Sequence, residues 1–398
     1  MSKYRITIAD VARLANVSLG TVSNVLNGTA SVRPRTRARV EAAIAELNFA
    51  PNALARTLPT RHRWPGAAAD PSVPRLVAVG SVSVDYIARV SVMPHRNDRI
   101  TAHNIEKSLG GPATNVAVIA AGLGDPFPLS VELATAVGDD ADSDWALGEL
   151  IERSVDIAAV RRVPGQRLSR CIVFVEENGS RTVINEPVEL EVSDLRRYSE
   201  ATGTDAPRCI CIDGSQIERM LDSVLELGRA GWRIALQSTD LPIHWRNPDR
   251  FRQMLRELDV IFVNRRIARD LTDCRGSEVQ LVEAVVENVR REPARAIVVL
   301  TLGERGALII PPGQAPIAVP AKSVDVIDVT GNGGALAGAF LAVWLHTGDP
   351  ALAGHWGTAA GSFISSVLGA LGASPTASEL QSLLAENAPE AADAAVTI

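Results

Sequence analysis

The sequence lacks the features that direct a chain into or across a membrane. No apolar run reaches the ~18–20 residues that are needed to span a bilayer. The first ten residues, MSKYRITIAD, contain no apolar stretch of the kind found in a secretory signal. We therefore expect a cytoplasmic protein without a membrane partner.

Cysteine is scarce, and its spacing is not that of a metal site or a disulfide framework. The four cysteines are Cys171, Cys209, Cys211 and Cys274. None forms a C-x-x-C pair, and none has a histidine nearby in the sequence, which favours ordinary core cysteines over metal ligands. Cys209 and Cys211 alternate by two on an expected strand, so they should share one face.

Charge is divided unevenly along the 398 residues, which are 46% hydrophobic and 22% charged, as in a folded globular protein. Residues 1–58 carry eight Lys/Arg and three Asp/Glu, a net charge of +5, whereas the remainder carries 32 and 43, a net charge of −11. A basic head on an acidic body indicates that the head alone meets phosphate groups. The length allows a small module followed by a large domain.

The basic head shows the pattern of three short helices. Thr7 and Asp10 form a capping pattern for the first helix. Ser18 can cap a second helix that runs to about Leu26, and Pro34 suits the first position of a third. The apolar face of this third helix carries Val40, Ala43, Ile44 and Leu47. Two short helices with a tight turn and a supporting helix predict a helix-turn-helix, and the alternative is a generic three-helix bundle.

The second helix of a helix-turn-helix enters the major groove with its first residues leading. We expect three of these residues to face base edges, namely Leu19, Gly20 and Asn24. Three others are better placed for phosphates, namely Ser18, Thr21 and Ser23.

Residues 6–58 closely resemble the LacI family of bacterial repressors along the stretch ITIADVARLANVSLGTVSNVLNGTASVRPRTRARVEAAIAELNFAPNALARTL. The resemblance implies a hinge helix over residues 51–58, whose Leu58 wedges into the minor groove. It also implies DNA contacts by Thr7, Asn52 and Leu54. The implied partner is double-stranded DNA with a palindromic operator, bound by a homodimer near the bacterial nucleoid, and no cofactor is needed for this binding.

A linker and an α/β domain follow the head. Residues 59–74 combine Pro, Gly and Ala without periodicity, which is typical of a linker. We expect strands at residues 76–80, 132–137, 209–212, 233–236, 260–263 and 296–301, with helical stretches between them. This alternation over residues 75–375 predicts an α/β domain with a mostly parallel sheet flanked by helices. A hairpin at residues 170–176 and 181–185, together with residues 84–92, predicts a small β lid. Residues 376–398 offer one helix and a tail.

The large domain resembles the PfkB, or ribokinase-like, family of sugar and nucleoside kinases. Four motifs occur in the family's order: VAVGSVSVDYI (77–87), GGPATNVAVIAAGLG (110–124), TLGERGA (301–307) and DVTGNGGALAGAF (328–340). The resemblance implies that the sugar site is lined by Asp85, Gly110, Gly111 and Asn115. It implies that the nucleotide or anion site uses Asn264, Thr301, Gly303, Gly306, Gly331, Asn332 and Gly333. ATP and Mg²⁺ are the cofactors of the family.

Two departures from the family pattern argue against phosphoryl transfer. In the motif D-T-x-G-A-G-D, the final Asp is the family's general base, and this chain has Gly334 there. In the motif N-x-x-E, the Glu position holds Ile267, which offers no oxygen to Mg²⁺. We therefore predict no catalytic residue and no metal site. Asp325 and Asp328 lie close in sequence, but we expect them on a strand, pointing elsewhere.

These features predict a transcriptional regulator whose kinase-like domain senses a sugar, a sugar phosphate or a nucleoside. Two alternatives stay open: an active carbohydrate kinase that also binds DNA, and a constitutive DNA binder that uses the kinase fold as a dimerisation scaffold. Whether a nucleotide still binds is also open. Ser83 and Pro112 stand where ribokinases often place Asn and Lys, which argues against ribose itself.

Overall fold

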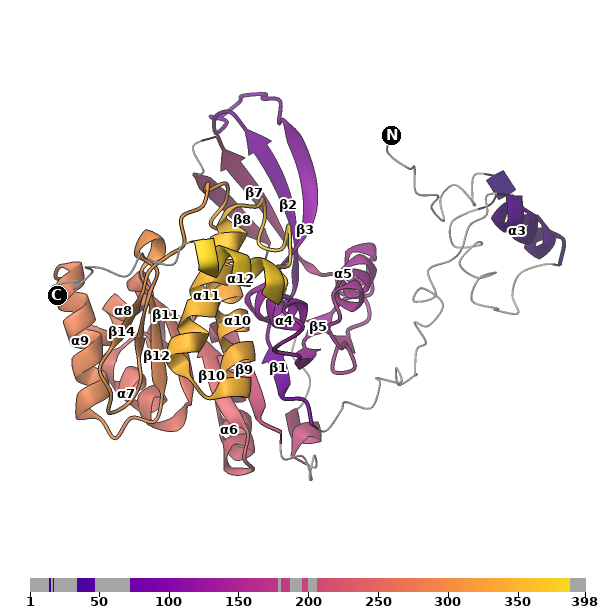
Figure 1. Cartoon of the computed structure of the whole chain (residues 1–398). Helices are drawn as coiled ribbons and strands as arrows, with labels where there is room; N and C mark the ends of the chain where they lie inside the picture. The colour runs from indigo at the N-terminus through magenta and orange to yellow at the C-terminus, as the bar shows by residue number, and fades with distance from the viewer. Residues whose placement is uncertain are drawn as a thin grey trace. The chain divides into compact units, whose positions relative to one another are not determined.

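The computed structural model describes residues 14–15, 17, 34–46, 72–177, 180–186, 195–199 and 206–386. The chain divides into two compact units, Met1–Pro65 and Gly66–Ile398, and each is considered by itself. Figure 1 shows the ribbon of both units and the labels used below. The predicted linker, residues 59–74, lies mostly outside the described residues, so its boundaries stay a prediction.

The first unit contains the predicted third helix, α3 (Pro34–Glu46). Val40 and Ala43 are buried on it, as the periodicity predicts. The guanidinium of Arg39 donates a hydrogen bond to the carbonyl of Ala15, which ties α3 to the helical residues 14–15. Of the other predicted core positions, Leu47 and the side chain of Ile44 lie outside the described part of the chain.

The second unit is built on an eight-stranded sheet in the order β14-β13-β12-β11-β10-β9-β1-β4. Its strands are β1 (Arg75–Val79), β4 (Ser130–Ala134), β9 (Arg208–Asp213), β10 (Arg233–Gln237), β11 (Val260–Asn264), β12 (Ile297–Thr301), β13 (Ala307–Ile310) and β14 (Ile317–Val319). Every pairing from β4 to β12 is parallel, and β13 and β14 continue the sheet antiparallel. The mostly parallel sheet predicted from the alternation is confirmed.

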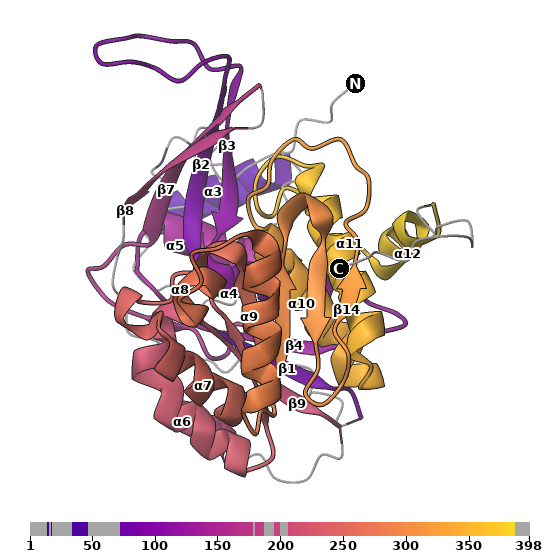
Figure 2. The same ribbon diagram turned by 90° about the vertical axis from the view of Figure 1, so that its left-hand side faces the viewer.

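Helices cover both faces of this sheet (Figures 1 and 2). The helices of the unit are α4 (Pro112–Gly122), α5 (Ala141–Glu152), α6 (Ile217–Arg229), α7 (Pro248–Glu257), α8 (Arg265–Thr272), α9 (Glu278–Arg291), α10 (Asn332–Thr347), α11 (Pro350–Ser365) and α12 (Ala377–Glu386). Leu76 and Ala78 of β1 pack into the layer that contains α4, α10 and α11. Val77 and Val79 pack into the opposite layer, with α6 to α9. Alternate residues of one strand thus face two apolar cores, as a sheet buried on both sides requires.

Cysteine packing agrees with the sequence spacing. Cys209 and Cys211 are both buried in the layer with α4 and α10, so they share one face of β9. All four cysteines are free thiols in the described residues. Among these residues, no helix is long and apolar enough to cross a membrane.

A second sheet stands apart from the central one and forms the lid (Figure 1). It has four strands in the order β3-β2-β7-β8. They are β2 (Ser83–Val90), β3 (Asn104–Gly110), β7 (Ser169–Glu176) and β8 (Arg181–Glu186). The predicted hairpin is confirmed as β7 and β8, which pair antiparallel. On its inner side Ile87, Val173 and Val175 pack together with Leu368 of the main body.

Two elements differ from the sequence prediction. The single strand expected over residues 132–137 is two strands, because β1 ends at Val79 and leaves residues beyond Ala134 without a neighbour in the central sheet. The chain there pairs instead as β5 (Ala136–Val137) with β6 (Arg161–Arg162). The lid strand β3 was missed, because most of its residues are polar and exposed and show no apolar alternation.

Candidate functional site

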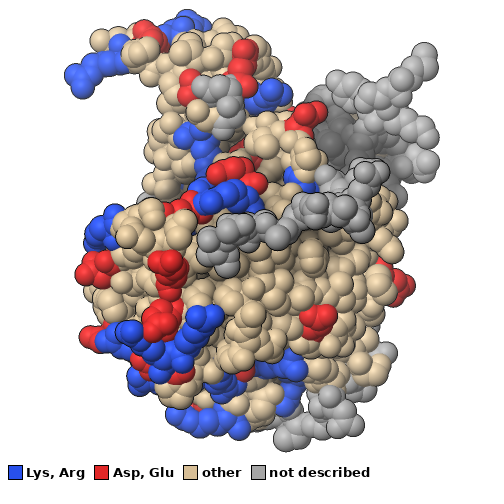
Figure 3. Space-filling model, turned by 60° about the vertical axis from the view of Figure 1, so that its left-hand side comes forward, with Lys and Arg blue, Asp and Glu red and all other residues tan. Residues whose placement is uncertain are grey.

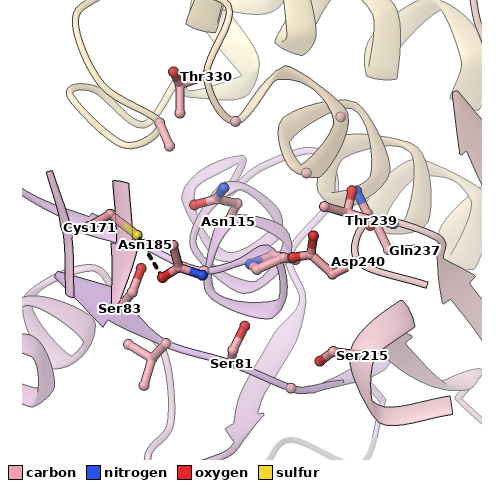
Figure 4. Close-up of a pocket in the computed structure, with 18 of the residues that line it drawn as sticks. Ser81, Ser83, Asn115, Cys171, Asn185, Ser215, Gln237, Thr239, Asp240 and Thr330 are labelled. Carbon is pink, nitrogen blue, oxygen red and sulfur yellow. Dashed lines mark hydrogen bonds between the residues drawn. The ribbon is translucent and has the colours of Figure 1, made fainter. Parts of the chain in front are cut away.

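A cavity of about 1040 Å³ lies where the carboxyl ends of the central strands face the lid sheet. Ser81 follows β1, Gln237 ends β10, Asn264 ends β11 and Thr301 ends β12, and all four line it. Figure 4 shows polar side chains from both sheets and from α4 around this space. Parallel α/β sheets bind ligands at this edge, because the connections to the next helices leave a crevice there.

Residues predicted for the sugar site come together at one end of the cavity. Asp85, Gly111 and Asn115 line it. Gly110 lies directly against them, because a Cβ at this position would sit 2.4 Å from an Asp85 carboxylate oxygen. Gly111 has a φ of +102°, and a Cβ there would sit 2.4 Å from the Ser81 carbonyl oxygen. Both glycines are therefore needed for close backbone packing around the site.

Asp85 is a buried carboxyl that faces the cavity from the lid strand β2. It is 6% exposed, and the Ser83 hydroxyl donates a hydrogen bond to it at 3.0 Å. Burial raises the pKa of Asp85 above its usual range, which the hydrogen bond from Ser83 offsets only in part. Burial likewise raises the pKa of the neighbouring Cys171 thiol to about 12, so this cysteine is protonated at neutral pH. Cys171 donates a hydrogen bond to Asn185 at 3.4 Å (Figure 4).

A second buried carboxyl was not predicted from the sequence. Asp213, at the end of β9, accepts hydrogen bonds from the Ser81 amide at 2.7 Å and from the Ser81 hydroxyl at 3.2 Å. Burial raises its pKa. Gly80 allows this contact, because a Cβ there would sit 2.0 Å from the Asp213 carboxylate. Asp213 thus holds the turn after β1 in place. The sequence signal that could have identified Asp213 was its position directly after the apolar residues 209–212.

Asn115 and Gly334 lie in contact on the floor of the cavity. Asn115 is 8% exposed, and its side-chain oxygen has no hydrogen-bond partner in the described part of the chain. A Cβ at Gly334 would sit 2.6 Å from the Cβ of Asn115. The position of the family's general base is therefore filled by a packed amide side chain. A ligand hydroxyl could donate to the unpaired Asn115 oxygen.

The turn before α10 presents backbone amides to the cavity. Gly331 adopts a left-handed conformation with a φ of +81°, and no side chain caps the helix. Gly331, Asn332 and Gly333 all line the cavity. The side-chain amide of Asn332 donates to Ser365 at 2.6 Å, which holds the turn in place. The first amides of a helix lack intrahelical partners, so this turn can bind an anion.

The loop before this turn connects the lid to the main body. Arg181 of β8 donates a hydrogen bond to the Thr330 hydroxyl at 2.6 Å and lies 4.0 Å from an Asp328 carboxylate oxygen. Asp328 accepts hydrogen bonds from the amides of Thr330 and Gly369. The expectation that Asp325 and Asp328 lie on a strand is wrong: both are in the loop after β14, which ends at Val319.

Only some of the residues predicted for the nucleotide site line the cavity. Asn264 and Thr301 line the cavity and are paired neighbours on β11 and β12. Asn264 also caps α8, because its side-chain oxygen accepts from the Ile267 amide at 2.9 Å. Gly303 and Gly306 do not line the cavity. Their φ values of +65° and +89° instead shape the tight turn between β12 and β13.

The residues around Asn264, Thr301 and the turn before α10 do not fit a Mg²⁺ ion. Ile267 is fully buried in the apolar layer with α6 to α9, so its position faces away from the cavity. Gly334 has no side chain. The carboxylates that line the cavity are Asp85, Glu218 and Asp240, and no group of three or more acidic, His or Cys residues in the described residues is arranged to hold a metal. Mg²⁺ requires oxygen ligands in near-octahedral geometry.

Several cavity residues were not predicted. Among them are Arg181, Gln237, Thr239, Asp240 and Arg266. Gln237 ends β10, and Thr239 and Asp240 follow it. The rule that ligands bind at the carboxyl ends of parallel strands was therefore the signal that could have found them.

The predicted DNA contacts lie outside the described residues. They are Thr7, Ser18, Leu19, Gly20, Thr21, Ser23, Asn24, Asn52, Leu54 and Leu58. On the face of the molecule seen in Figure 3, the acidic and basic side chains of the described residues are interspersed. That face therefore offers no extended basic area for phosphates, in keeping with the acidic charge of residues 59–398.

A doubly covered sheet with a β lid over a cavity at its carboxyl edge is the architecture of ribokinase-like proteins. Ribokinase from Thermotoga maritima is similar in structure, with a TM-score of 0.61 and 21% identity over 79% of this chain and 99% of that one. Residues 73–377 match the model of the pfkB family of carbohydrate kinases, so the chain belongs to this family. A relative is the ATP-dependent ribose-1-phosphate kinase of Halopiger xanaduensis, 27% identical over 78% of this chain and 98% of that protein.

The first unit contains a stretch that matches a different family. Residues 7–52 match the lacI family of bacterial regulatory proteins. The ribose operon repressor of Escherichia coli is 60% identical over 52 residues, which are 13% of this chain and 16% of the repressor. The likeness is therefore confined to the DNA-binding domain. The chain joins the DNA-binding domain of a bacterial regulator to a kinase-family domain.

Proposed function

We propose that this protein is a transcriptional regulator whose PfkB domain binds a sugar, a sugar phosphate or a nucleoside as an effector and does not phosphorylate it. One observation carries the proposal: the polar cavity is retained, whereas the position of the general base is Gly334, packed against Asn115. Binding and catalysis make separate demands on a site, and this chain meets only the first.

Loss of the base and of the metal ligands removes two large contributions to phosphoryl transfer. A positioned general base typically contributes about 10²–10⁴ in rate. The electrostatic stabilisation that a metal supplies to the transferred group is of comparable importance. Neither Ile267 nor Gly334 can replace these contributions, and Asp328 is already occupied by the amides of Thr330 and Gly369.

The remaining polar groups suit recognition of hydroxyl groups. Asp85 and Asn115 both face the cavity, and the unpaired oxygen of Asn115 favours a ligand that donates a hydrogen bond. The name of the Halopiger relative, whose likeness covers 78% of this chain, refers to ribose 1-phosphate, so pentoses, their phosphates and nucleosides come first among candidate effectors. Arg181, which links the lid to the loop before α10, gives the lid a contact that an effector can strengthen or replace.

The regulator is proposed to act as a homodimer on a palindromic operator. Effector binding would change lid closure and, through the dimer, the spacing of the two DNA-binding heads. An effector can shift operator affinity only as far as it binds the two conformations differently.

The enzymatic alternative is tested by ADP formation. Purified full-length protein is incubated with Mg-ATP and a panel of pentoses, pentose phosphates and nucleosides. The expected result is no ADP above the rate without sugar. Turnover by the natural protein would show an active kinase and overturn the proposal.

Two variants make this test specific. Gly334→Asp restores a carboxylate, but its Cβ also crowds Asn115, since the two Cβ atoms would be 2.6 Å apart. Gly334→Ala introduces the same crowding without the carboxylate. Turnover that arises in Gly334→Asp and not in Gly334→Ala would identify the missing carboxylate as the cause of inactivity.

A further inference from the structure

Two adjacent arginines at the start of α8 have opposite surroundings. Arg265 is paired with Glu278 at 3.2 Å and with Glu304 at 3.5 Å, and it does not line the cavity. Arg266 lines the cavity, is exposed, and has no hydrogen-bond or ion-pair partner in the described residues. Arg266 is therefore a permanent positive charge that faces the cavity without a counter-ion.

Arg266 stands beside the groups that can hold phosphates. Asn264 and Thr301 line the same end of the cavity, at the ends of neighbouring strands. The 16-residue helix α10 begins in this cavity and has no acidic residue in its first turn. A second observation points to a ligand here: Asn115 lines the cavity and contacts Gly334, it is more than nine-tenths buried, and its buried side-chain oxygen has no hydrogen-bond partner among the described residues.

This end of the cavity lacks the side chains that would hold a divalent cation. Position 334 is a glycine, and position 267 is an isoleucine that is buried in the core and faces away from the cavity. The carboxylates that do line the cavity, Asp85, Glu218 and Asp240, form no metal-binding group among the described residues. A phosphate group here would therefore meet the positive charge of Arg266 and no metal ligands.

We infer that this end of the cavity binds the phosphate groups of a nucleoside diphosphate or triphosphate without a divalent cation, with Arg266 in the cation's place. The inference concerns the same cavity as the proposed function and rests on its being a binding site. A guanidinium carries a fixed charge and donates paired hydrogen bonds that match phosphate oxygens. The amides before α10 complete the neutralisation, as helix N-termini do for anions.

The test is isothermal titration of the full-length protein with ADP and ATP, once with excess EDTA and once with Mg²⁺. We expect binding in EDTA, with little change in Kd when Mg²⁺ is added. Arg266→Gln should weaken binding by about tenfold or more, the usual effect of losing a charge-assisted hydrogen bond. Arg265→Gln, with its side chain directed to Glu278 and Glu304, is the matched control and should leave Kd unchanged. Thermal unfolding of both variants reports whether they are folded.

Three outcomes would overturn the inference. They are absence of nucleotide binding in EDTA, binding that requires Mg²⁺, and equal affinity of Arg266→Gln and the natural protein. A parallel titration with ribose 5-phosphate distinguishes the source of the phosphate. If Arg266→Gln weakens the sugar phosphate and no nucleotide binds, the nucleotide assignment fails. The titration measures neither DNA binding nor turnover. A negative result would therefore overturn the nucleotide inference alone, and the proposed regulatory function is tested separately by ADP formation and operator binding.

Discussion

Asp85 shows how a single residue is retained at a cost to stability. Its carboxyl is buried against Gly110, and burial raises its pKa. A raised pKa means that the folded state binds the proton more tightly than the unfolded chain does. The contribution of this group to stability is therefore complete at pH values below the pKa of the unfolded chain, and it is lost as the pH rises through the folded-state value. A buried carboxyl that lowers stability at neutral pH is expected where it serves ligand binding.

Asp85→Asn should therefore be more stable than the natural protein at neutral pH, and the difference in stability should shrink as the pH falls through the folded-state pKa and the carboxyl becomes protonated. Affinity for the effector should fall by about tenfold to a hundredfold, since a charge-assisted hydrogen bond is lost. Urea denaturation at several pH values and a ligand titration measure the two effects. A variant that is destabilised equally at every pH would contradict this account of Asp85.

Site residues that belong to a short sequence motif could be predicted. Site residues whose role depends on a contact with a distant part of the chain could not. Asp85, Gly111 and Asn115 were found from short motifs, and the structure brings them to one cavity. Asp213 and Arg181 act through partners more than 100 residues away in the sequence, Ser81 and Thr330. A single sequence does not contain these pairings, because they depend on how the strands and the lid come together.

At the scale of elements, the lid is fastened to α5 by a cluster of charges. Asp142 of α5 accepts hydrogen bonds from Lys107 of β3 at 2.7 Å and from Arg170 of β7 at 2.6 Å. The Tyr86 hydroxyl of β2 donates to it at 3.1 Å. Burial opposes ionisation of Asp142, but the hydrogen bonds from Lys107, Arg170 and Tyr86 outweigh it and lower its pKa. Three of the four lid strands thus meet at one carboxylate.

Asp142→Ala should destabilise the second unit by about 1.5–3 kcal/mol, since two cations lose the same partner. Amide hydrogen exchange should accelerate in β2, β3 and β7 more than in the central sheet. Because the pKa of Asp142 is lowered, its stabilisation is present at neutral pH and is lost as the pH falls through the folded-state value. The difference in the free energy of unfolding between Asp142→Ala and the natural protein should therefore be largest near neutral pH. Uniform exchange across both sheets would contradict a local role.

The elements themselves were predicted well where apolar alternation was strong. The strands β9 to β12 are buried and begin and end within one residue of their predicted positions. The polar strand β3 was missed, and residues 132–137 were wrongly joined, because pairing partners and not propensity decide both cases. Sheet boundaries depend on where the neighbouring strand ends, which local sequence does not specify.

For the whole molecule, the outer face of the lid is a candidate dimer contact. Ile105, Ile172 and Ile184 lie on this face and are 69%, 45% and 56% exposed. The strand register places Ile172 opposite Ile184, so these two side chains form an exposed apolar pair. Exposed apolar groups of this kind often mark protein interfaces. A lid that forms the dimer contact would connect effector binding directly to the spacing of the DNA-binding heads.

Ile184→Glu should shift the protein toward monomers in sedimentation velocity and weaken operator binding by about tenfold or more. Ile243→Glu is the control, because Ile243 is 73% exposed and lies outside the lid. It should leave both properties unchanged. An Ile184→Glu protein that stays dimeric would remove the lid from the interface.

The central claim, that effector binding in the PfkB domain controls DNA binding, is tested most directly by operator affinity with and without ligand. The operator is first selected from random DNA with the full-length protein. Fluorescence anisotropy then gives its Kd in the presence of each compound that stabilises the second unit against heat. We predict that at least one such compound changes the Kd about fivefold or more, the usual lower range of allosteric coupling. A compound that binds the domain tightly and leaves operator affinity unchanged would contradict the account.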